Sequence, residues 1–302
     1  MKKNLVFIAS GGRTGSMFLG KYLSQVIEDC YSEHEPDLFA GLSQLTFSRI
    51  KHFGFKHMIL DRCLGRSGVR VLGQKLMKGE ITDSECFLRL REMRARYHSQ
   101  ISQGLIIESY YSWWLFANNI NRIWPHAKMA GIIRDPRTWI DSWKAHCPAR
   151  RNNSSHDGFI QPLLTPESIN DTQWSPHWRN IGQTGRLAWD WLNVYRELVN
   201  AQNNSSQVRI FKFEDLFGSE SQSLDSFIQF ITNHCNRHYR VLDLEIMKRA
   251  PVNSSANTEN LWQTWTAAEA QVVDQICGPI MKLFGYGTEP EWQKLLSSET
   301  GK

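Results

Sequence analysis

The chain carries a glycine-rich loop directly after its first apolar run, where backbone amides could hold a phosphate. Residues 5–23 read LVFIASGGRTGSMFLGKYL. The apolar start predicts a buried strand, and the amphipathic pattern after the loop predicts a helix. Three glycines within residues 11–15 let the backbone turn tightly and approach an anion, and the amides that open the helix would point toward it. Arg13 and Ser16 add donors for charge-assisted hydrogen bonds.

The loop differs from the Walker A loop in two places. Walker A has a Lys after its last glycine, followed by a Ser or Thr that holds magnesium. Here Ser16 stands at the position of that Lys, and Ser10 stands where the first glycine of the pattern would be. The sequence therefore predicts a nucleotide bound without a catalytic Mg²⁺, with its phosphate held by Gly12, Arg13, Thr14, Gly15, Ser16 and Met17.

A second apolar run also ends in charged residues, in the segment 128–143, KMAGIIRDPRTWIDSW. Arg134 lies at the carboxyl end of the run, where ligands of open α/β sheets bind, and Pro136 suits the first position of a helix. Ser142 follows eight residues after Arg134, about two turns into that helix. An anion that touches both residues would lie beside the helix, which suits a separate, terminal phosphate.

The two segments together resemble the nucleotide motifs of the sulfotransferases that use 3′-phosphoadenosine-5′-phosphosulfate (PAPS). In that family a strand, loop and helix hold the 5′-phosphosulfate, and a later strand and helix supply an Arg and a Ser, eight residues apart, to the 3′-phosphate. GGRTGS resembles the Arg-containing loop of carbohydrate, tyrosyl-protein and many bacterial sulfotransferases, so the resemblance gives Arg13 the role of the loop cation. Weaker likenesses occur at 105–114, 208–217 and 276–287.

The resemblance implies transfer of a sulfuryl group from PAPS to the hydroxyl of a carbohydrate, glycolipid or small metabolite. The nucleotide product would be 3′,5′-ADP, and no metal would be required. A late loop of the family closes over PAPS, which assigns contacts here to Arg249 and Asn253 in the polar stretch 248–266. The expected partner is the acceptor that carries the hydroxyl. We expect no nucleic-acid partner, since a net charge of +5 does not by itself indicate nucleic-acid binding.

Sulfuryl transfer to a hydroxyl requires a base that accepts the hydroxyl proton. The segment 31–37, YSEHEPD, follows the first predicted helix, where related Arg-loop sulfotransferases carry an acidic base. Glu35 is the first candidate. His34 and Glu33 remain alternatives, because the sequence does not show which side chain points inward.

Two other functions remain open. A P-loop kinase or NTPase is disfavoured by the missing Walker Lys and by the lack of a recognisable magnesium-binding carboxylate strand. A non-catalytic nucleotide-binding module would retain Arg134 and Ser142 but would need no base.

Four apolar runs alternate with longer helical or irregular stretches, which predicts an α/β fold with a mainly parallel central sheet flanked by helices. They cover residues 5–9, 105–107, 129–133 and 208–213. We expect one P-loop-containing, three-layer sulfotransferase-like domain over residues 1–302, with irregular excursions near 36–80 and 145–186 that read the acceptor. Residues 186–199 place apolar side chains at helical spacing and predict a core-facing helix.

The remaining charged residues have structural interpretations. The arginines at 89, 91, 94 and 96 share a helical pattern with two glutamates, which favours a solvated, ion-paired face. Glu108 at a predicted strand end is expected to be a buried, paired carboxylate. His234, Cys235 and His238 lack a nearby fourth ligand, so no metal site is predicted.

The spacing of the cysteines and the length of the apolar run near the N-terminus indicate the cellular compartment. The six cysteines form no CxxC pair and are expected to be reduced core residues without disulfides. The apolar run near the N-terminus is about five residues long, too short for a signal sequence or membrane span. We therefore expect a cytoplasmic protein without stable membrane insertion.

Overall fold

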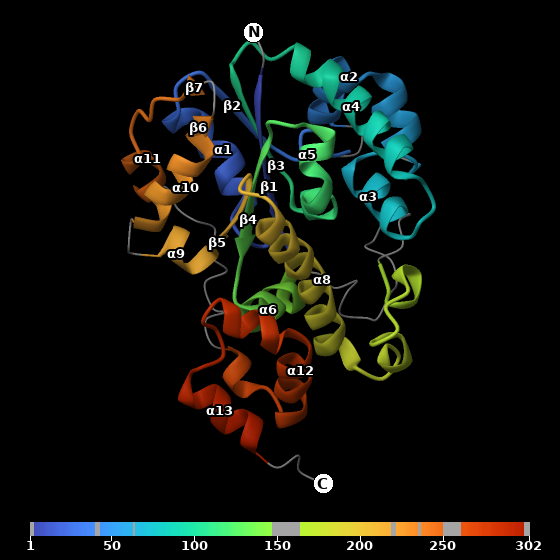
Figure 1. Cartoon of the computed structure of the whole chain (residues 1–302), viewed down its shortest axis with the longest axis vertical. Coiled ribbons are helices and arrows are strands. Elements are labelled where there is room, and N and C mark those ends of the chain that lie inside the picture. The colour runs from blue at the N-terminus through green and yellow to red at the C-terminus, as the bar shows by residue number, and fades with distance from the viewer. Residues whose placement is uncertain are drawn as a thin grey trace. The chain divides into compact units, whose positions relative to one another are not determined.

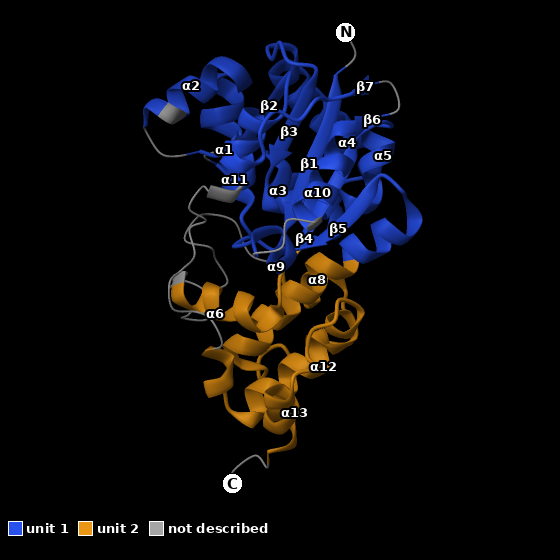
Figure 2. Cartoon of the chain, turned by 90° about the vertical axis from the view of Figure 1, so that its left-hand side faces the viewer, with its two compact units in different colours: residues 1–132, 197–252 blue, residues 133–196, 253–302 orange. Residues whose placement is uncertain are grey.

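The structure is a computed structural model of the chain. It describes residues 3–39, 43–62, 64–146, 164–218, 222–234, 237–249 and 261–298. Residue contacts divide the chain into two compact units, coloured separately in Figure 2. Unit 1 comprises residues 1–132 and 197–252, and unit 2 comprises residues 133–196 and 253–302.

Unit 1 contains a five-stranded sheet of order β2-β3-β1-β4-β5 (Figure 1). Its strands are β1 (Asn4–Ser10), β2 (Cys30–His34), β3 (Leu105–Ser109), β4 (Lys128–Ile133, whose last residue belongs to unit 2) and β5 (Val208–Lys212). The pairs β1–β3, β1–β4 and β2–β3 are parallel. All seven residues of β1 are buried, as expected for a central parallel strand. The α/β fold predicted from the sequence, with its mainly parallel sheet, is confirmed.

The other elements of unit 1 are mostly helices. They are α1 (Ser16–Val26), α2 (Gln44–Phe53), η1 (Lys56–Arg62), α3 (Val69–Met77), α4 (Asp83–Ser99), η2 (Tyr111–Asn119), α5 (Ile120–Ile123), α9 (Phe213–Phe217), α10 (Gln222–Thr232), α11 (Glu245–Arg249) and the short strands β6 (Asn233–His234) and β7 (Arg237–His238).

Helices cover both faces of the sheet, as Figure 1 shows. On one face, Val6 and Ile8 of β1 belong to a buried cluster with apolar residues of α1 and α10, including Leu19 and Phe227. Because side chains alternate along a strand, Phe7 points to the opposite face. There its ring lies 4.3 Å from that of Trp113 in η2, measured between ring centroids. Apolar burial on both faces therefore fixes the position of β1 and of the loop that follows it.

Two parts of unit 1 differ from the sequence expectation. The four predicted apolar runs are strands, but β2 was not among them, since its sequence CYSEH is mostly polar. Residues 36–80, expected to be irregular, contain α2, the π-helix η1 and α3. The helical period of α3 is hard to see in the sequence because its buried face includes Gly73 and Gln74. Gly73 is needed there, since a Cβ atom would lie 2.5 Å from Leu115.

A buried ionic cluster, consisting of Arg94, Asp37, Glu108 and His98, joins the segment after β2 to α4 and β3. Arg94 Nη2 donates to Asp37 Oδ1 at 3.2 Å, and Arg94 Nε lies 2.9 Å from Glu108 Oε2. The other oxygen of Glu108 lies 2.6 Å from His98 Nε2. The side chains of Arg94 and Asp37 have no exposed surface. Burial acts to lower the pKa of Arg94, but the two carboxylates outweigh it and raise that pKa, so the guanidinium stays charged.

The cluster confirms one expectation and corrects another. Glu108 is the buried, paired carboxylate predicted from the sequence. Arg94 does not belong to a solvated face, because its position in α4 points inward, where its guanidinium lies over the ring of Phe53 at 5.3 Å. Arg89, five residues earlier on the same helix, does form the expected exposed ion pair with Glu85.

Unit 2 is mostly helical in the part that the structure describes. Its elements are α6 (Pro136–His146), η3 (Glu167–Ile169), η4 (Ser175–His177), α8 (Gly182–Asn204, whose last residues belong to unit 1), η5 (Leu261–Thr264), α12 (Ala267–Leu283) and α13 (Pro290–Ser297). The core-facing stripe predicted within residues 186–199 is confirmed, since Leu187, Trp191, Val194, Tyr195 and Leu198 are all buried.

Two buried charged groups hold unit 2 together. Arg137 in α6 pairs with Asp135 and with Glu289, which precedes α13. Its guanidinium lies 4.4 Å from the ring centroid of Trp262. On the same helix, Asp141 Oδ1 accepts a hydrogen bond from Trp265 Nε1 at 2.9 Å. Both groups tie α6 to the C-terminal part of the chain.

Of the six cysteines, Cys30, Cys86 and Cys277 lie in the described part of the chain, where each is a buried free thiol. The other three lie outside the described residues.

Replacing Arg94 with Met should destabilise unit 1, because it leaves two carboxylates buried without their cation. We expect the free energy of unfolding, measured by urea denaturation, to fall by about 3–5 kcal/mol. Arg89→Met on the same helix is the matched control and should cost less than about 1 kcal/mol, since it removes an exposed ion pair. Equal losses in the two variants would contradict the role assigned to Arg94.

Asp141 should make the stability of unit 2 depend on pH. Burial raises the pKa of its carboxyl from 3.8 to about 6, against the opposing effect of the Trp265 hydrogen bond. The folded state therefore holds a proton that the unfolded chain has lost, and stability falls as pH rises from about 4 to about 6. The side chain of Asp141→Asn stays neutral over this range. The free energy of unfolding of this variant, measured in urea and compared with that of the native chain, should therefore rise from about pH 4 to about pH 6 by on the order of 2–3 kcal/mol. A difference between the two proteins that is constant with pH would contradict this.

Candidate phosphate-binding site

The loop between β1 and α1 has the backbone geometry of an anion-binding turn. Gly12, Arg13 and Gly15 have φ angles of 75°, 55° and 75°, all in the left-handed region. Residues other than glycine rarely adopt this conformation, so the surroundings of Arg13 must stabilise it. Loops of this kind can turn successive amides toward one point and form concavities that bind anions. The Gly12 amide donates to Ser10 Oγ at 3.1 Å and closes the start of the turn.

Gly15 fills a position that no other residue would fit. Its φ of 75° favours glycine, and a Cβ atom there would lie 2.5 Å from the ring of Phe217 in α9. The ring of Phe217 in turn packs edge-on against Phe18, at 5.5 Å between ring centroids. The loop is therefore fixed from outside by α9 as well as by its own turn.

Thr14 provides a polar group that lacks a partner among the described residues. The residue has no exposed surface, and its Oγ1 atom makes no hydrogen bond there. An unpaired buried hydroxyl is costly, and an oxygen of a bound anion would satisfy it. This is an independent indication that the loop is shaped for a ligand.

The first turn of α1 adds amide donors and the positive end of a helix dipole. The N-cap residue is Gly15, which has no side chain to cap these amides, and the first turn holds no acidic residue. Ser109 Oγ at the end of β3 donates to the carbonyl oxygen of Ser16 at 2.6 Å, which fixes the start of the helix. Met17 in the same turn is 62% exposed.

Arg13 supplies the positive charge of the loop. Its side chain is exposed, and partial burial lowers its pKa from 12.5. An arginine remains a cation at neutral pH. The loop thus combines amides, a hydroxyl and a guanidinium, which is the donor set that a phosphate or sulfate group needs.

The three base candidates separate onto different sides of β2. Side chains alternate along a strand, so Glu33 points away from the side taken by Ser32 and His34. Glu33 Oε2 accepts hydrogen bonds at 2.7 Å from the hydroxyls of Tyr31 and Tyr97. On the other side, Ser32 Oγ donates to the Gly20 carbonyl of α1 at 2.9 Å. Glu33 is therefore engaged in the packing of β2 against α4.

His34 and Glu35 form a pair at the end of β2. His34 Nε2 lies 3.8 Å from Glu35 Oε1, and the two side chains are 22% and 13% exposed. Burial lowers the pKa of His34, although a hydrogen bond to the Ser109 backbone opposes the shift, so neutral imidazole is favoured. Glu35 has a φ of 47°, which turns the chain away from the strand direction. Its amide donates to the Ser109 carbonyl at 3.1 Å.

The sheet brings this pair and the loop to one edge of unit 1. The strand register places His34 opposite Ser109, and Ser109 opposite Ile8, two residues before the end of β1. Gly20 of α1 approaches β2 so closely that a Cβ atom would lie 2.7 Å from the His34 nitrogen. The loop after β1 and the residues after β2 therefore lie on either side of the carboxyl end of β3.

The segment after Glu35 is anchored by the buried ionic cluster. Asp37 stands two residues after Glu35 and is held by Arg94. Arg49 donates to the carbonyl oxygen of Leu38, the next residue. The position of Glu35 is thus set by α4 and α2, which the sequence alone did not indicate.

The second predicted motif lies in unit 2. Arg134 directly follows β4, its Nε donates to Thr138 Oγ1 at 3.1 Å, and its carbonyl oxygen accepts from Trp191 Nε1 at 2.9 Å. Ser142 lies within α6, as the helix start at Pro136 predicted, but it has no exposed surface. The roles of both residues in binding a 3′-phosphate stay predictions.

The last two predicted contacts fall at the limit of what the structure describes. Arg249 is the last residue of α11, and its side chain is not described. Asn253 lies outside the described residues. Within the described ranges, no three His, Cys, Asp or Glu side chains are grouped as ligands of a metal ion. Nor does any described helix have the length and apolar composition that a membrane crossing requires.

The sequence analysis did not predict how the residues around the loop contact it. The sequence placed Ser109 beside Glu108 at a strand end but did not show its partners, and in the structure its hydroxyl contacts α1 and its carbonyl contacts Glu35. Thr14 was predicted as a loop residue, but its unpaired hydroxyl shows only in three dimensions. The signal that could have found Ser109 is its position at the carboxyl end of a strand beside β1.

Comparisons with known proteins include a likeness to a solved structure that extends over the whole chain. No protein-family model matches the sequence, and no curated protein matches it. A solved structure described as a sulfotransferase domain from the curacin biosynthetic pathway is similar to this chain, with 12% sequence identity and a TM-score of 0.39. The match covers 100% of this chain and 99% of that one.

Proposed function

We propose that this protein is a sulfotransferase that moves a sulfuryl group from PAPS to a hydroxyl acceptor. The observation that carries the proposal is the loop of residues 11–15, with its left-handed backbone, its glycine N-cap and a buried Thr14 hydroxyl that has no partner among the described residues. The specific choice of PAPS rests on the sequence resemblance of this loop and of the Arg134 segment.

In the proposed reaction the loop stabilises charge on the transferring group. Sulfuryl transfer, like phosphoryl transfer, needs an in-line acceptor and stabilisation of the equatorial oxygens and of the leaving phosphate. The loop amides and Thr14 would hold the 5′-phosphosulfate, and Arg13 would neutralise charge on the bridging and equatorial oxygens. The transferring group carries less charge than a phosphoryl group, so side-chain cations can suffice.

Glu35 is the proposed base, with His34 as the alternative. Glu35 is mostly buried at the same sheet edge as the loop, and its backbone is held by Ser109. His34 lies beside it, and its lowered pKa favours the neutral ring, which can accept a proton. Glu33 is the weakest of the three, because two tyrosine hydroxyls already occupy one of its oxygens.

Arg134 is proposed to bind the 3′-phosphate of the nucleotide. Its guanidinium is half-buried and carries the charge that such a phosphate requires. Ser142 is fully buried, so Arg134 is the better residue with which to test this assignment.

The nucleotide assignment predicts a preference for a 3′-phosphate. In calorimetric titrations, 3′,5′-ADP should bind more tightly than ADP or ATP, and Arg134→Ala should weaken its binding by about tenfold or more while leaving ADP binding nearly unchanged. Arg13→Ala should weaken all three nucleotides. Arg89→Ala, which removes an exposed arginine, is the control and should have no effect. Tighter binding of ATP than of 3′,5′-ADP would overturn the assignment and favour a kinase or NTPase.

The base assignment predicts that turnover and binding separate in Glu35→Gln. Transfer of labelled sulfate from PAPS to a panel of phenols, alcohols and saccharides should fall by about 10²-fold or more. Binding of 3′,5′-ADP should stay within about twofold of the native value. A larger loss of transfer in His34→Gln than in Glu35→Gln would move the role to His34.

The same assay separates an enzyme from a binding module. Equal loss of transfer and of nucleotide binding in Glu35→Gln would show a structural role for that residue. Binding of 3′,5′-ADP by the native protein without transfer to any acceptor of the panel would favour a non-catalytic nucleotide-binding module.

A further inference from the structure

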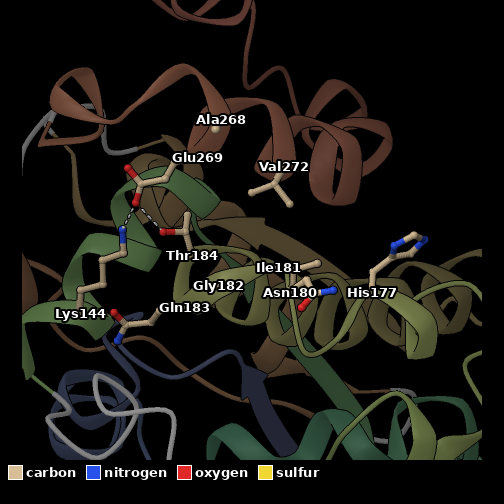
Figure 3. Close-up of a pocket in the computed structure, with 10 residues that line it drawn as sticks. All are labelled: Lys144, His177, Asn180, Ile181, Gly182, Gln183, Thr184, Ala268, Glu269 and Val272. Atoms are coloured by element: carbon tan, nitrogen blue, oxygen red, sulfur yellow. Dashed lines mark hydrogen bonds and ion pairs between the residues drawn. The ribbon is translucent and has the colours of Figure 1, made fainter. Parts of the chain in front are cut away.

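Figure 3 shows a pocket of unit 2 in which the charged side chains are paired. Lys144 Nζ lies 3.1 Å from Glu269 Oε1, so the pocket offers little free charge to a ligand. A surface of unit 1 has the opposite character. There, exposed lysines lie among exposed apolar side chains.

Exposed apolar side chains are concentrated in the segment 38–64 of unit 1. Ten large apolar side chains are exposed in the described part of the chain, and five of them fall in this segment. These five are Leu38, Phe47, Phe55, Leu60 and Leu64. Phe47 and Phe55 are each 60% exposed. Soluble proteins rarely expose large apolar patches, and such patches commonly mark sites of interaction.

The helices α2 and η1 both pack against α4 from the same side. Phe53 at the end of α2 stacks on Tyr97 of α4, at 4.7 Å between ring centroids, and the ring of His57 in η1 lies 5.5 Å from that of Phe53. Gly54, between the two helices, approaches α4 so closely that a Cβ atom would lie 2.8 Å from Arg96. The inner sides of both helices therefore meet at α4, and their exposed side chains lie on the outer side. Figure 2 shows α2 at the outer edge of unit 1.

The exposed charges of this segment are all positive. Residues 38–66 contain one acidic residue, Asp61, and it is half-buried. Lys51, Lys56 and Arg66 are exposed. Among the residues that the structure describes, neither Lys51 nor Lys56 forms an ion pair.

The two lysines lie beside the exposed aromatic rings. Lys51 stands four residues after Phe47, on the same face of α2, and Lys56 directly follows Phe55. Together with Leu60, these four residues form what we call the α2–η1 surface. It combines apolar side chains with cations whose charge no described neighbour neutralises.

An anionic lipid bilayer complements both features of the α2–η1 surface. Phe and Leu side chains bury themselves at the boundary between headgroups and acyl chains, and lysines are attracted to anionic headgroups. A second copy of the chain is a poorer occupant, because a two-fold dimer would set the lysines of the two surfaces against each other.

We propose that the α2–η1 surface docks reversibly on an anionic lipid bilayer. Phe47, Phe55 and Leu60 enter the interface, while Lys51 and Lys56 contact the headgroups. The proposal does not depend on the proposed transfer reaction.

The test is cosedimentation of the full chain with lipid vesicles. The probes are vesicles of phosphatidylcholine alone and vesicles that also contain phosphatidylserine. We expect at least tenfold tighter binding to the mixed vesicles, and we expect added salt to weaken it. Absence of binding to the mixed vesicles, or equal affinity for the two kinds, would overturn the proposal.

The apolar part is tested by Phe47→Ser/Phe55→Ser, which should weaken binding to mixed vesicles at least tenfold. Leu242→Ser/Leu283→Ser is the matched control, since it removes two exposed apolar side chains elsewhere, and its affinity should stay within twofold of the native value. All four side chains are exposed, so both variants should keep the native circular dichroism spectrum.

The charged part is tested by Lys51→Gln/Lys56→Gln. Each lysine near an anionic surface contributes about fivefold in affinity, so this variant should bind mixed vesicles at least tenfold more weakly. Lys282→Gln/Lys294→Gln, which removes two exposed lysines of unit 2, should bind within twofold of the native protein. Native affinity in both variants of the α2–η1 surface would overturn the proposal.

Sedimentation velocity without lipid tests the surface as a subunit interface. We expect Phe47→Ser/Phe55→Ser to have the same oligomeric state as the native protein. Self-association of the native protein that this variant abolishes would overturn the proposal in favour of a contact between copies.

Binding of 3′,5′-ADP, measured on the same proteins, keeps this proposal apart from the proposed function. It should be unchanged in the variants of the α2–η1 surface. Its absence in the native protein would count against the proposed function while leaving the vesicle result intact.

Discussion

The candidate site of unit 1 depends on one buried charge, the guanidinium of Arg94. It lies between two carboxylates from different segments, Asp37 after β2 and Glu108 in β3. Such a group is costly to bury unless its partners stay in place, so the cluster ties α4, β3 and the β2 exit into one arrangement. Because Glu35 is two residues from Asp37, the position of the proposed base follows from this pairing.

The second requirement is close packing between α1 and the sheet. Gly15 leaves room for Phe217, and Gly20 leaves room for His34. Ser109 contacts both α1 and the segment after β2. Its hydroxyl donates to the carbonyl oxygen of Ser16, and its carbonyl oxygen accepts from the Glu35 amide. These contacts bring the proposed phosphate-binding loop and a histidine–glutamate pair to one sheet edge. The proposed transfer to a hydroxyl needs such a combination, in which donors for a charged group lie near a group that can accept a proton.

The sequence predicted the parts of this arrangement that are local. The apolar runs identified four strands, and the glycines and Arg13 identified the turn, because each signal lies within a few residues. It could not predict that Arg94 faces Asp37, 57 residues away, or that Glu33 and His34 differ in their partners. Such pairings depend on the register of the sheet and on the face that α4 presents. The strand β2 and the helices within 36–80 were missed because their buried faces contain polar residues and glycine.

The most direct test of the central claim, that the loop of residues 11–15 holds a nucleotide phosphate, is NMR of protein labelled with ¹⁵N-glycine. Titration with 3′,5′-ADP should shift the amide signals of Gly12 and Gly15 strongly, since these amides border the proposed phosphate. The signals of Gly79 and Gly285, which lie in turns with open space around them, should stay in place. Saturation of the protein with nucleotide while Gly12 and Gly15 remain unshifted would contradict the account.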